Sequence, residues 1–130
     1  MFNVFFAVIF MSLAAFAGPA DAAAKKSLNN LLQAYAQGNI AEAEGLIDPV
    51  MLGYQQLVDA MRSSVSSQKQ IKIHLKEAKF TTAKDIVVIR TSWEKRYLSN
   101  VVSGKTLFLM QLIRKEWTLS SQSGDNIFAM

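Results

Sequence analysis

Five side chains are candidates for proton transfer or hydrogen-bond donation in a reaction centre. A carboxylate can act as a general base, with a tyrosine or histidine as its partner, when burial in an apolar pocket adjusts their pKa values. The sequence shows no recognisable acid–base set that brings such groups together. The candidates are Asp48, Tyr54, Asp59, His74 and Glu94.

The candidate acids also have structural explanations. Asp48 precedes Pro49, and this pair is typical of the N-cap and first residue of a helix. Tyr54 falls on an apolar helical stripe, which predicts a core position with the hydroxyl at a pocket rim. Asp59 falls off that stripe and is expected in solvent. Glu94 precedes two cations and is expected to form an ion pair.

His74 is the only histidine, and the chain has no cysteine. His74 alternates with Lys72 and Lys76, so we expect it on the polar face of a strand, with Glu94 as its one suggested carboxylate partner. This composition excludes thiol catalysis, cysteine-ligated metals, lipoprotein attachment and a His-rich metal site within one chain. We therefore expect no metal and no cofactor, and the sequence favours binding over catalysis.

The most distinctive local string is Trp93-Glu94-Lys95-Arg96-Tyr97. In a strand, Trp93, Lys95 and Tyr97 share one side, and the other two residues share the opposite side. Two structures fit the string. It can form a pocket mouth where aromatic rings and cations meet an anionic or carbohydrate ligand. Alternatively, the tryptophan belongs to the core and the charges mark where the strand leaves it.

Three helices are predicted in the first half of the chain, from apolar residues spaced three and four apart. Ser27 is the expected N-cap of the first helix, which Gly38 ends. Asn39 and Glu42 form a capping box at the start of a short second helix. The third helix begins at Asp48-Pro49 and frays at its serine-rich end.

After Gln68 the apolar period changes from near 3.6 to 2, which indicates strands. Short loops join them, so consecutive strands must be antiparallel. The predicted strands are Gln70–Lys76, Asp85–Tyr97, Lys105–Arg114 and Trp117–Gln122. The sequence therefore predicts an α+β domain, with three helices packed on a curved antiparallel sheet of about four strands and a cavity where the two layers do not meet.

The chain opens with an uncharged apolar stretch, Val4 to Gly18, followed by a proline and a run of small residues. This layout is typical of a secretory signal peptide over residues 1–24, with cleavage near Ala22 to Ala24. Ala15-Phe16-Ala17 offers an earlier cleavage site. A membrane anchor is the rival interpretation, but the apolar run is shorter than the ~20 residues that cross a bilayer.

Cleavage would leave a single domain over residues 25–130, in a periplasmic or secreted bacterial protein without a stable membrane span. The net charge is +4, and all but two of the 14 basic residues lie at Arg62 or beyond. Such a distribution favours an anionic partner, for example an acidic envelope polymer, although it also serves solubility. Export argues against nucleic acid. The predicted basic sheet face consists of Lys72, Lys76, Arg90 and Arg96.

Three segments have recognisable architectural forms. Ala34–Ala43 has the pattern of a helix end, a Gly-Asn pair and a short second helix. Val88–Leu98 has the pattern of a long strand with a central tryptophan. Leu107–Leu119 has the pattern of a hairpin that ends in Trp-x-Leu. Together they resemble the nuclear transport factor 2-like superfamily, which includes ketosteroid isomerase-like and polyketide cyclase-like proteins, over residues 27–128. The resemblance implies a cone-shaped domain with a cystatin-like sheet, a pocket between sheet and helices, and a homodimer through the sheet.

We therefore expect a non-catalytic binding or protein-interaction domain that holds a small apolar or anionic ligand between helices and sheet. The resemblance leaves a cofactor-independent isomerase or cyclase in the same pocket as an alternative, although no residue of the isomerase pattern carries over. A basic sheet face that binds an acidic envelope polymer is a further alternative. The predicted pocket lining is Tyr35, Tyr54, Val87, Trp93 and Phe108.

Overall fold

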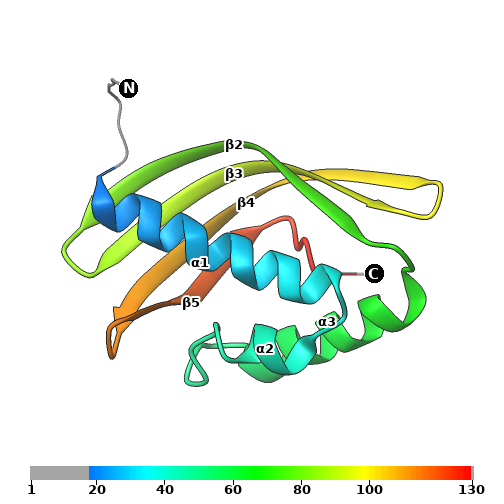
Figure 1. Ribbon diagram of the computed structural model, residues 1–130, viewed down its shortest axis with the longest axis horizontal. Helices are drawn as coiled ribbons and strands as arrows, with labels where there is room; N and C mark the ends of the chain where they lie inside the picture. The colour runs from blue at the N-terminus through cyan, green and yellow to red at the C-terminus, as the bar shows by residue number, and fades with distance from the viewer. Residues whose placement is uncertain (1–17, 130) are drawn as a thin grey trace, which may run out of the picture.

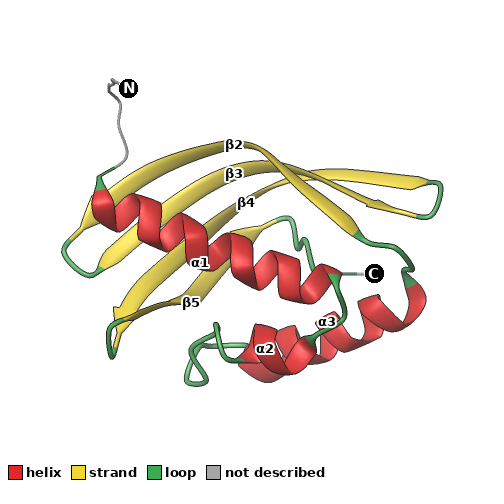
Figure 2. Cartoon of the chain, in the orientation of Figure 1, coloured by secondary structure: helices red, strands yellow, loops and turns green. Residues whose placement is uncertain are grey.

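The computed structural model describes residues 18–129 as three helices and a four-stranded antiparallel sheet, and the first helix lies across one face of the sheet (Figures 1 and 2). The predicted fold class is confirmed, and the strands lie side by side in chain order. Residues 1–17, the larger part of the predicted signal peptide, lie outside the described residues. The elements are α1 Pro19–Ala36, α2 Ile40–Glu44, α3 Tyr54–Ser67, β2 Lys72–Ala83, β3 Ile86–Tyr97, β4 Asn100–Ile113 and β5 Glu116–Gly124.

Helix α1 begins at Pro19, so the predicted start after Ser27 is wrong. Proline suits the first helical position because its missing N–H needs no partner there. Asp21 accepts a hydrogen bond from the Gly18 N–H at 3.3 Å and another from the Thr82 hydroxyl, which ties the helix start to the end of β2. None of the helices described is long and apolar enough to span a bilayer.

Helix α3 begins at Tyr54, and the predicted start at Asp48-Pro49 is wrong. The Asp48 N–H donates to the Leu119 carbonyl at 2.9 Å, and the Leu119 N–H donates to the Leu46 carbonyl at 2.9 Å. The chain around Asp48 therefore adds one bridge to the edge of β5 instead of entering a helix. Gly53, with φ at 82°, then turns the chain into α3, because glycine adopts the left-handed conformation at no steric cost.

Strand β2 is longer than predicted and contains a β-bulge between Leu75 and Glu77. One extra residue reverses which side chains face the helices. Before the bulge Leu75 faces inward, whereas beyond it Phe80 is half-buried and Lys79 is exposed. Strand β4 also exceeds its prediction, because it begins at Asn100, in a segment that the sequence assigned to a loop.

The core lies between the sheet and α1, which crosses the sheet diagonally (Figure 1). Along β3 the burial alternates residue by residue, so one row of side chains enters the core and the next faces away. Ile127 and Phe128 also belong to this core, because both are fully buried. The largest core side chains include Leu28, Leu31, Tyr35, Ile89, Trp93, Phe108 and Met110.

Candidate functional site

The candidate acids and bases lie apart from one another. Asp48 accepts a hydrogen bond from the Val50 N–H at 3.1 Å in the turn before α3. On α3, Asp59 is exposed and accepts from the Gln55 side chain at 3.0 Å. The Tyr54 hydroxyl donates to the Glu44 carboxylate at 3.3 Å; burial, and then the nearby carboxylate, raise the pKa of Tyr54.

His74 and Glu94 lie opposite each other on β2 and β3. The Glu94 carboxylate, however, accepts from the Arg96 Nε at 2.5 Å, and this hydrogen bond lowers the pKa of Glu94. The predicted ion pair of Glu94 is therefore present, and no hydrogen bond joins Glu94 to His74 within residues 18–129. The same residues include no group of three side chains that could hold a metal ion.

Four of the five predicted pocket residues lie within the core. Tyr35, Val87, Trp93 and Phe108 are each at most 2% exposed. The Trp93 indole N–H donates to the Thr106 hydroxyl at 2.8 Å, so even its polar atom is satisfied inside the protein. Tyr54 is only partly buried and lies on α3 beside Glu44. These side chains pack as a core, and the two cavities described below have different linings.

A buried hydrogen-bond ring lies beside this core. Lys95 is 2% exposed, and its Nζ donates to the Tyr35 hydroxyl at 3.1 Å and to the Ala129 carbonyl at 2.9 Å. The Tyr35 hydroxyl contacts Ser64, whose hydroxyl donates to Gln68 Oε1 at 2.7 Å. Gln68 Nε2 donates to the same Ala129 carbonyl at 3.3 Å, which closes the ring.

The direction of every bond in this ring is determined. The Ser64 proton is used on Gln68, so the Tyr35 hydroxyl must donate to Ser64 and accept from Lys95. Burial lowers the pKa of Lys95 from 10.5 to about 8 and raises the pKa of Tyr35. The sequence placed Lys95 correctly on the Trp93 side of the strand, but its partners come from α1, α3 and the chain end.

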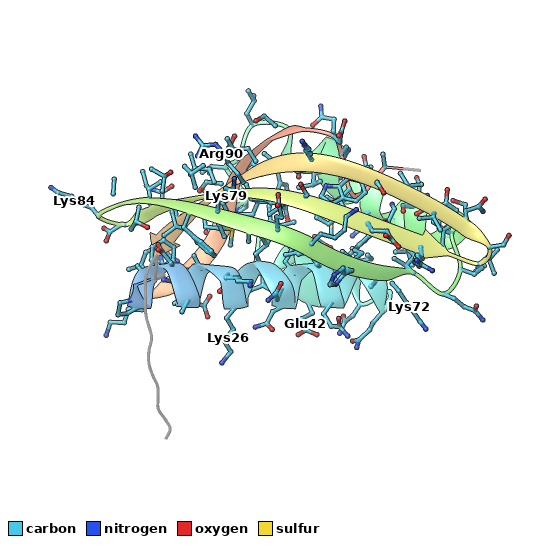
Figure 3. The ribbon with its side chains drawn as sticks, turned by 90° about the horizontal axis from the view of Figure 1, so that it is seen from above. Lys26, Glu42, Lys72, Lys79, Lys84 and Arg90 are labelled. Carbon is cyan, nitrogen blue, oxygen red and sulfur yellow. The ribbon has the colours of Figure 1, made fainter. Side chains whose placement is uncertain are left out.

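A groove of about 370 Å³ opens on the sheet face away from the helices. Lys79 of β2 lies directly opposite Arg90 of β3, and Figure 3 shows the two side chains close together on that face. Lys105 of β4 lies one row further along, next to Ser92. Glu77 is the only acidic residue in the lining, and neither of the two ion pairs among residues 18–129 involves a groove residue.

The groove overlaps the predicted basic face in part. Of its four predicted residues, Arg90 lines the groove; Lys72 lies opposite Arg96, which is held by its ion pair. Lys79 was missed because the predicted strand ended before it. Ala78 and Phe80 alternate with polar neighbours, and this pattern could have extended the predicted strand. The bulge moves the inward-facing side chains from odd-numbered positions before it to even-numbered positions after it.

A second cleft, of about 290 Å³, lies between α1 and β2. Asn29 and Gln33 line one side and His74 the other, with Leu32 and Ile73 also in the lining. No side-chain hydrogen bond joins the two walls within the described residues. This cleft lies beside the outer edge of the sheet, because β2 pairs only with β3.

Comparisons with solved structures give the same architecture at low sequence identity. Bdellovibrio bacteriovorus Bd1075 matches with a TM-score of 0.69 and 14% identity over 79% of this chain, but the chain spans only 39% of that protein. A candidate ketosteroid isomerase from Shewanella frigidimarina matches with a TM-score of 0.65 and 13% identity, covering 82% of this chain and 98% of that one.

A nuclear transport factor 2-like protein from Cytophaga hutchinsonii matches with a TM-score of 0.66 and 15% identity, over 85% of this chain and 100% of that one. No protein-family model and no curated protein matches the chain. At these identities the likeness shows a shared nuclear transport factor 2-like fold and carries no catalytic residue over to this chain.

Proposed function

We propose that this domain of nuclear transport factor 2-like fold is an exported, non-catalytic binding domain. Its outer groove binds an acidic envelope polymer through phosphate or carboxylate groups. The observation that carries the proposal is the placement of Lys79 directly opposite Arg90 in a groove that also contains Lys105. Like charges that face each other across strands destabilise a sheet, and an anion placed between them removes that repulsion.

The groove offers several kinds of contact to such a polymer. Three cations face one carboxylate, so the local field attracts anions. The hydroxyls of Ser92 and Ser123 supply neutral hydrogen-bond partners, and Leu107 supplies an apolar floor for a sugar ring. The candidate acids and bases do not converge on this groove, which is why binding is proposed rather than an isomerase or cyclase reaction.

Binding to a carboxylate polymer can be tested with polygalacturonate as the probe and neutral dextran as the control. We expect the double substitution Lys79→Ser/Arg90→Ser to weaken polygalacturonate binding roughly tenfold or more, because two cations leave the groove. Binding of the unchanged protein should also fall steeply as salt rises through about 0.15 M, where the screening length is about 8 Å. Isothermal titration calorimetry at several salt concentrations measures both effects.

Lys72→Ser/Lys76→Ser is the matched control, because it removes two lysines of the predicted basic face that do not line the groove. Net charge changes equally in the two double variants. Equal weakening of both, or binding that is insensitive to salt, would show that the groove is not the site. The predicted homodimer through the sheet would cover the same face, so sedimentation of free and polymer-bound protein determines which of the two occupies it.

We also propose that the signal peptide is removed after Ala17, the earlier of the predicted sites. Cleavage near Ala22 to Ala24 would remove the helix start at Pro19 and the Asp21 carboxylate that bonds Thr82. A cut after Ala24 would also remove Ala24 itself, which is fully buried in the core.

The intact mass of the protein secreted from a bacterial host measures this directly. We expect a mature chain that begins at Gly18, one residue before the proline that starts α1. A mass that corresponds to a start at Ala23 or Lys25 would contradict the proposed site. A full-length chain found in the membrane fraction would instead favour the anchor interpretation.

A further inference from the structure

The hairpin between β3 and β4 ends in an apolar tip. Residues 97–103, which form this tip, contain no charged side chain. Leu98 is 61% exposed, Val101 54% and Val102 39%. A single exposed aliphatic side chain is common on a protein surface, but several gathered at one place mark an interaction surface. The tip is therefore a candidate contact site.

The backbone of the tip also differs from that of the other hairpin turns. Leu98 has φ at 55°, in the left-handed region that favours glycine and asparagine. The other two turns also contain left-handed residues, but these are the cations Lys84, Arg114 and Lys115. In Figure 1 those two turns lie at the left-hand end of the sheet, and the apolar tip lies at the right-hand end. Only Leu98 combines a strained backbone with an exposed apolar side chain, and such strain is typical of functional positions.

The apolar side chains surround the end of the hairpin instead of covering one face. Val101 lies opposite Arg96, on the face away from the helices, and Val102 lies opposite the buried Lys95, on the other face. Leu98 lies at the turn between them. The exposed parts of three aliphatic side chains also fall well below the ~800 Å² that each partner buries in a stable protein interface. A fluid apolar medium, which can enclose the tip from both sides, fits this arrangement better than a protein surface does.

Two cations lie just behind the tip. Lys72 of β2 pairs opposite Arg96 of β3, and both side chains are exposed. Arg96 pairs with Glu94, whereas Lys72 takes part in neither ion pair of residues 18–129. Arg96 is two residues from Leu98, or about 7 Å along the strand, and apolar groups enter a membrane interface by roughly 5–10 Å. A tip inserted to that depth places both cations at the level of the lipid phosphates.

We propose that this tip inserts Leu98, Val101 and Val102 into the surface of an anionic phospholipid membrane, while Lys72 and Arg96 contact the phosphate groups. The association is peripheral and reversible, because few apolar side chains enter the lipid and the cations contribute only near a negative surface. The tip shares no residue with the outer groove, so either proposal can fail without the other.

The test uses cosedimentation with vesicles made of equal parts phosphatidylglycerol and phosphatidylcholine. We expect the unchanged protein to bind them, and Leu98→Asn to weaken binding roughly tenfold because an apolar contact with the lipid is lost. Asparagine suits the left-handed conformation better than leucine does, so the urea midpoint of this variant should not fall. A merely structural role for Leu98 predicts unchanged vesicle binding.

Lys84→Asn is the matched control, because it makes the same change at a left-handed position of another turn. Figure 3 shows Lys84 at the opposite end of the molecule from Lys72. The removed charge therefore lies far beyond the screening length of about 8 Å from the tip, and binding should stay within about twofold of the unchanged protein. Equal weakening by Lys84→Asn and Leu98→Asn would show that binding depends on overall charge and would contradict the proposal.

Further measurements distinguish the tip from other sites. Ser99→Trp places a fluorophore at the turn, and its emission should shift to shorter wavelength on the mixed vesicles; no shift contradicts insertion. Vesicle binding that is lost in Lys79→Ser/Arg90→Ser but kept in Leu98→Asn would assign the lipid to the outer groove. A dimer that Leu98→Asn dissociates in sedimentation would show that a second copy covers the tip. Either of these results, or no binding of the unchanged protein to the vesicles, would overturn the proposal.

Discussion

Substitution of Lys95 by methionine is expected to stabilise the folded protein at neutral pH by about 3 kcal/mol. Burial lowers the pKa of Lys95 from 10.5 to about 8, which means that the fold disfavours the charged form. Methionine keeps an unbranched stem and removes the charge. The Tyr35 hydroxyl still donates to Ser64, and the Ala129 carbonyl still accepts from Gln68, so no partner is left without a hydrogen bond.

The same residue makes stability depend on pH in the unchanged protein. Folded Lys95 loses its proton near pH 8 and the unfolded residue near pH 10.5, so the unfolded chain binds more protons between these values. Stability therefore rises with pH from about 8 toward 10. The raised pKa of Tyr35 acts in the opposite direction above pH 10. Among residues 18–129, Ser64, Gln68 and Tyr97 also lie near the ammonium.

Urea unfolding at several pH values between about 7 and 10 measures both effects. The unchanged protein should gain stability over this interval, and Lys95→Met should start higher and lose most of the rise. If Lys95→Met is less stable than the unchanged protein at neutral pH, the ring is a net stabilising element and the expectation is wrong. Lys76→Met, at an exposed position of β2, is the control for loss of a surface charge.

Gly104→Ala should destabilise the protein by about 3 kcal/mol, because a methyl group has no room there. Gly104 lies opposite Trp93 in the sheet, and an added Cβ would be 2.6 Å from the Trp93 ring and 2.9 Å from Asp125 Cβ. The Trp93 indole must therefore move, which disturbs its hydrogen bond to Thr106. Asp125 must also shift, although its carboxylate accepts from the Lys105 N–H at 2.8 Å.

Gly45→Ala is the matched control, since Gly45 has φ at −66° and its added Cβ would be in ordinary contact with Glu42 at 3.4 Å. We expect a change within roughly 0.5 kcal/mol for this variant. Urea unfolding followed by tryptophan fluorescence compares the two, and the Gly104→Ala spectrum should also change because Trp93 moves. Similar midpoints for both variants would contradict the packing argument.

Local sequence patterns predicted the helices and strands well where contacts with distant segments do not override them. The alternation along β3 identified which face enters the core, and it placed Trp93 and Lys95 on that face. Helix starts were predicted less well, because a cap is a local preference that tertiary contacts can override. Asp48 and Pro49 have the composition of a helix start, but the backbone of Asp48 is engaged with Leu119 of β5.

The candidate sites depended on contacts between distant segments. The predicted basic face included Arg90 but not Lys79, because a bulge near Glu77 shifts the phase of β2, and no local pattern predicted that bulge. The buried ring joins Tyr35, Lys95 and Ala129, which are far apart in the chain, so neither spacing nor composition could indicate it.

By itself, the sequence determined the fold class, the order of the strands and the exclusion of thiol chemistry and cysteine-ligated metals, because these follow from periodicity and composition. Only the tertiary structure decided where charges meet. Register places Lys79 against Arg90, and packing of the chain end against α1 and α3 places a carbonyl on Lys95. Electrostatic interactions depend on distances through space and on burial, and folding sets both.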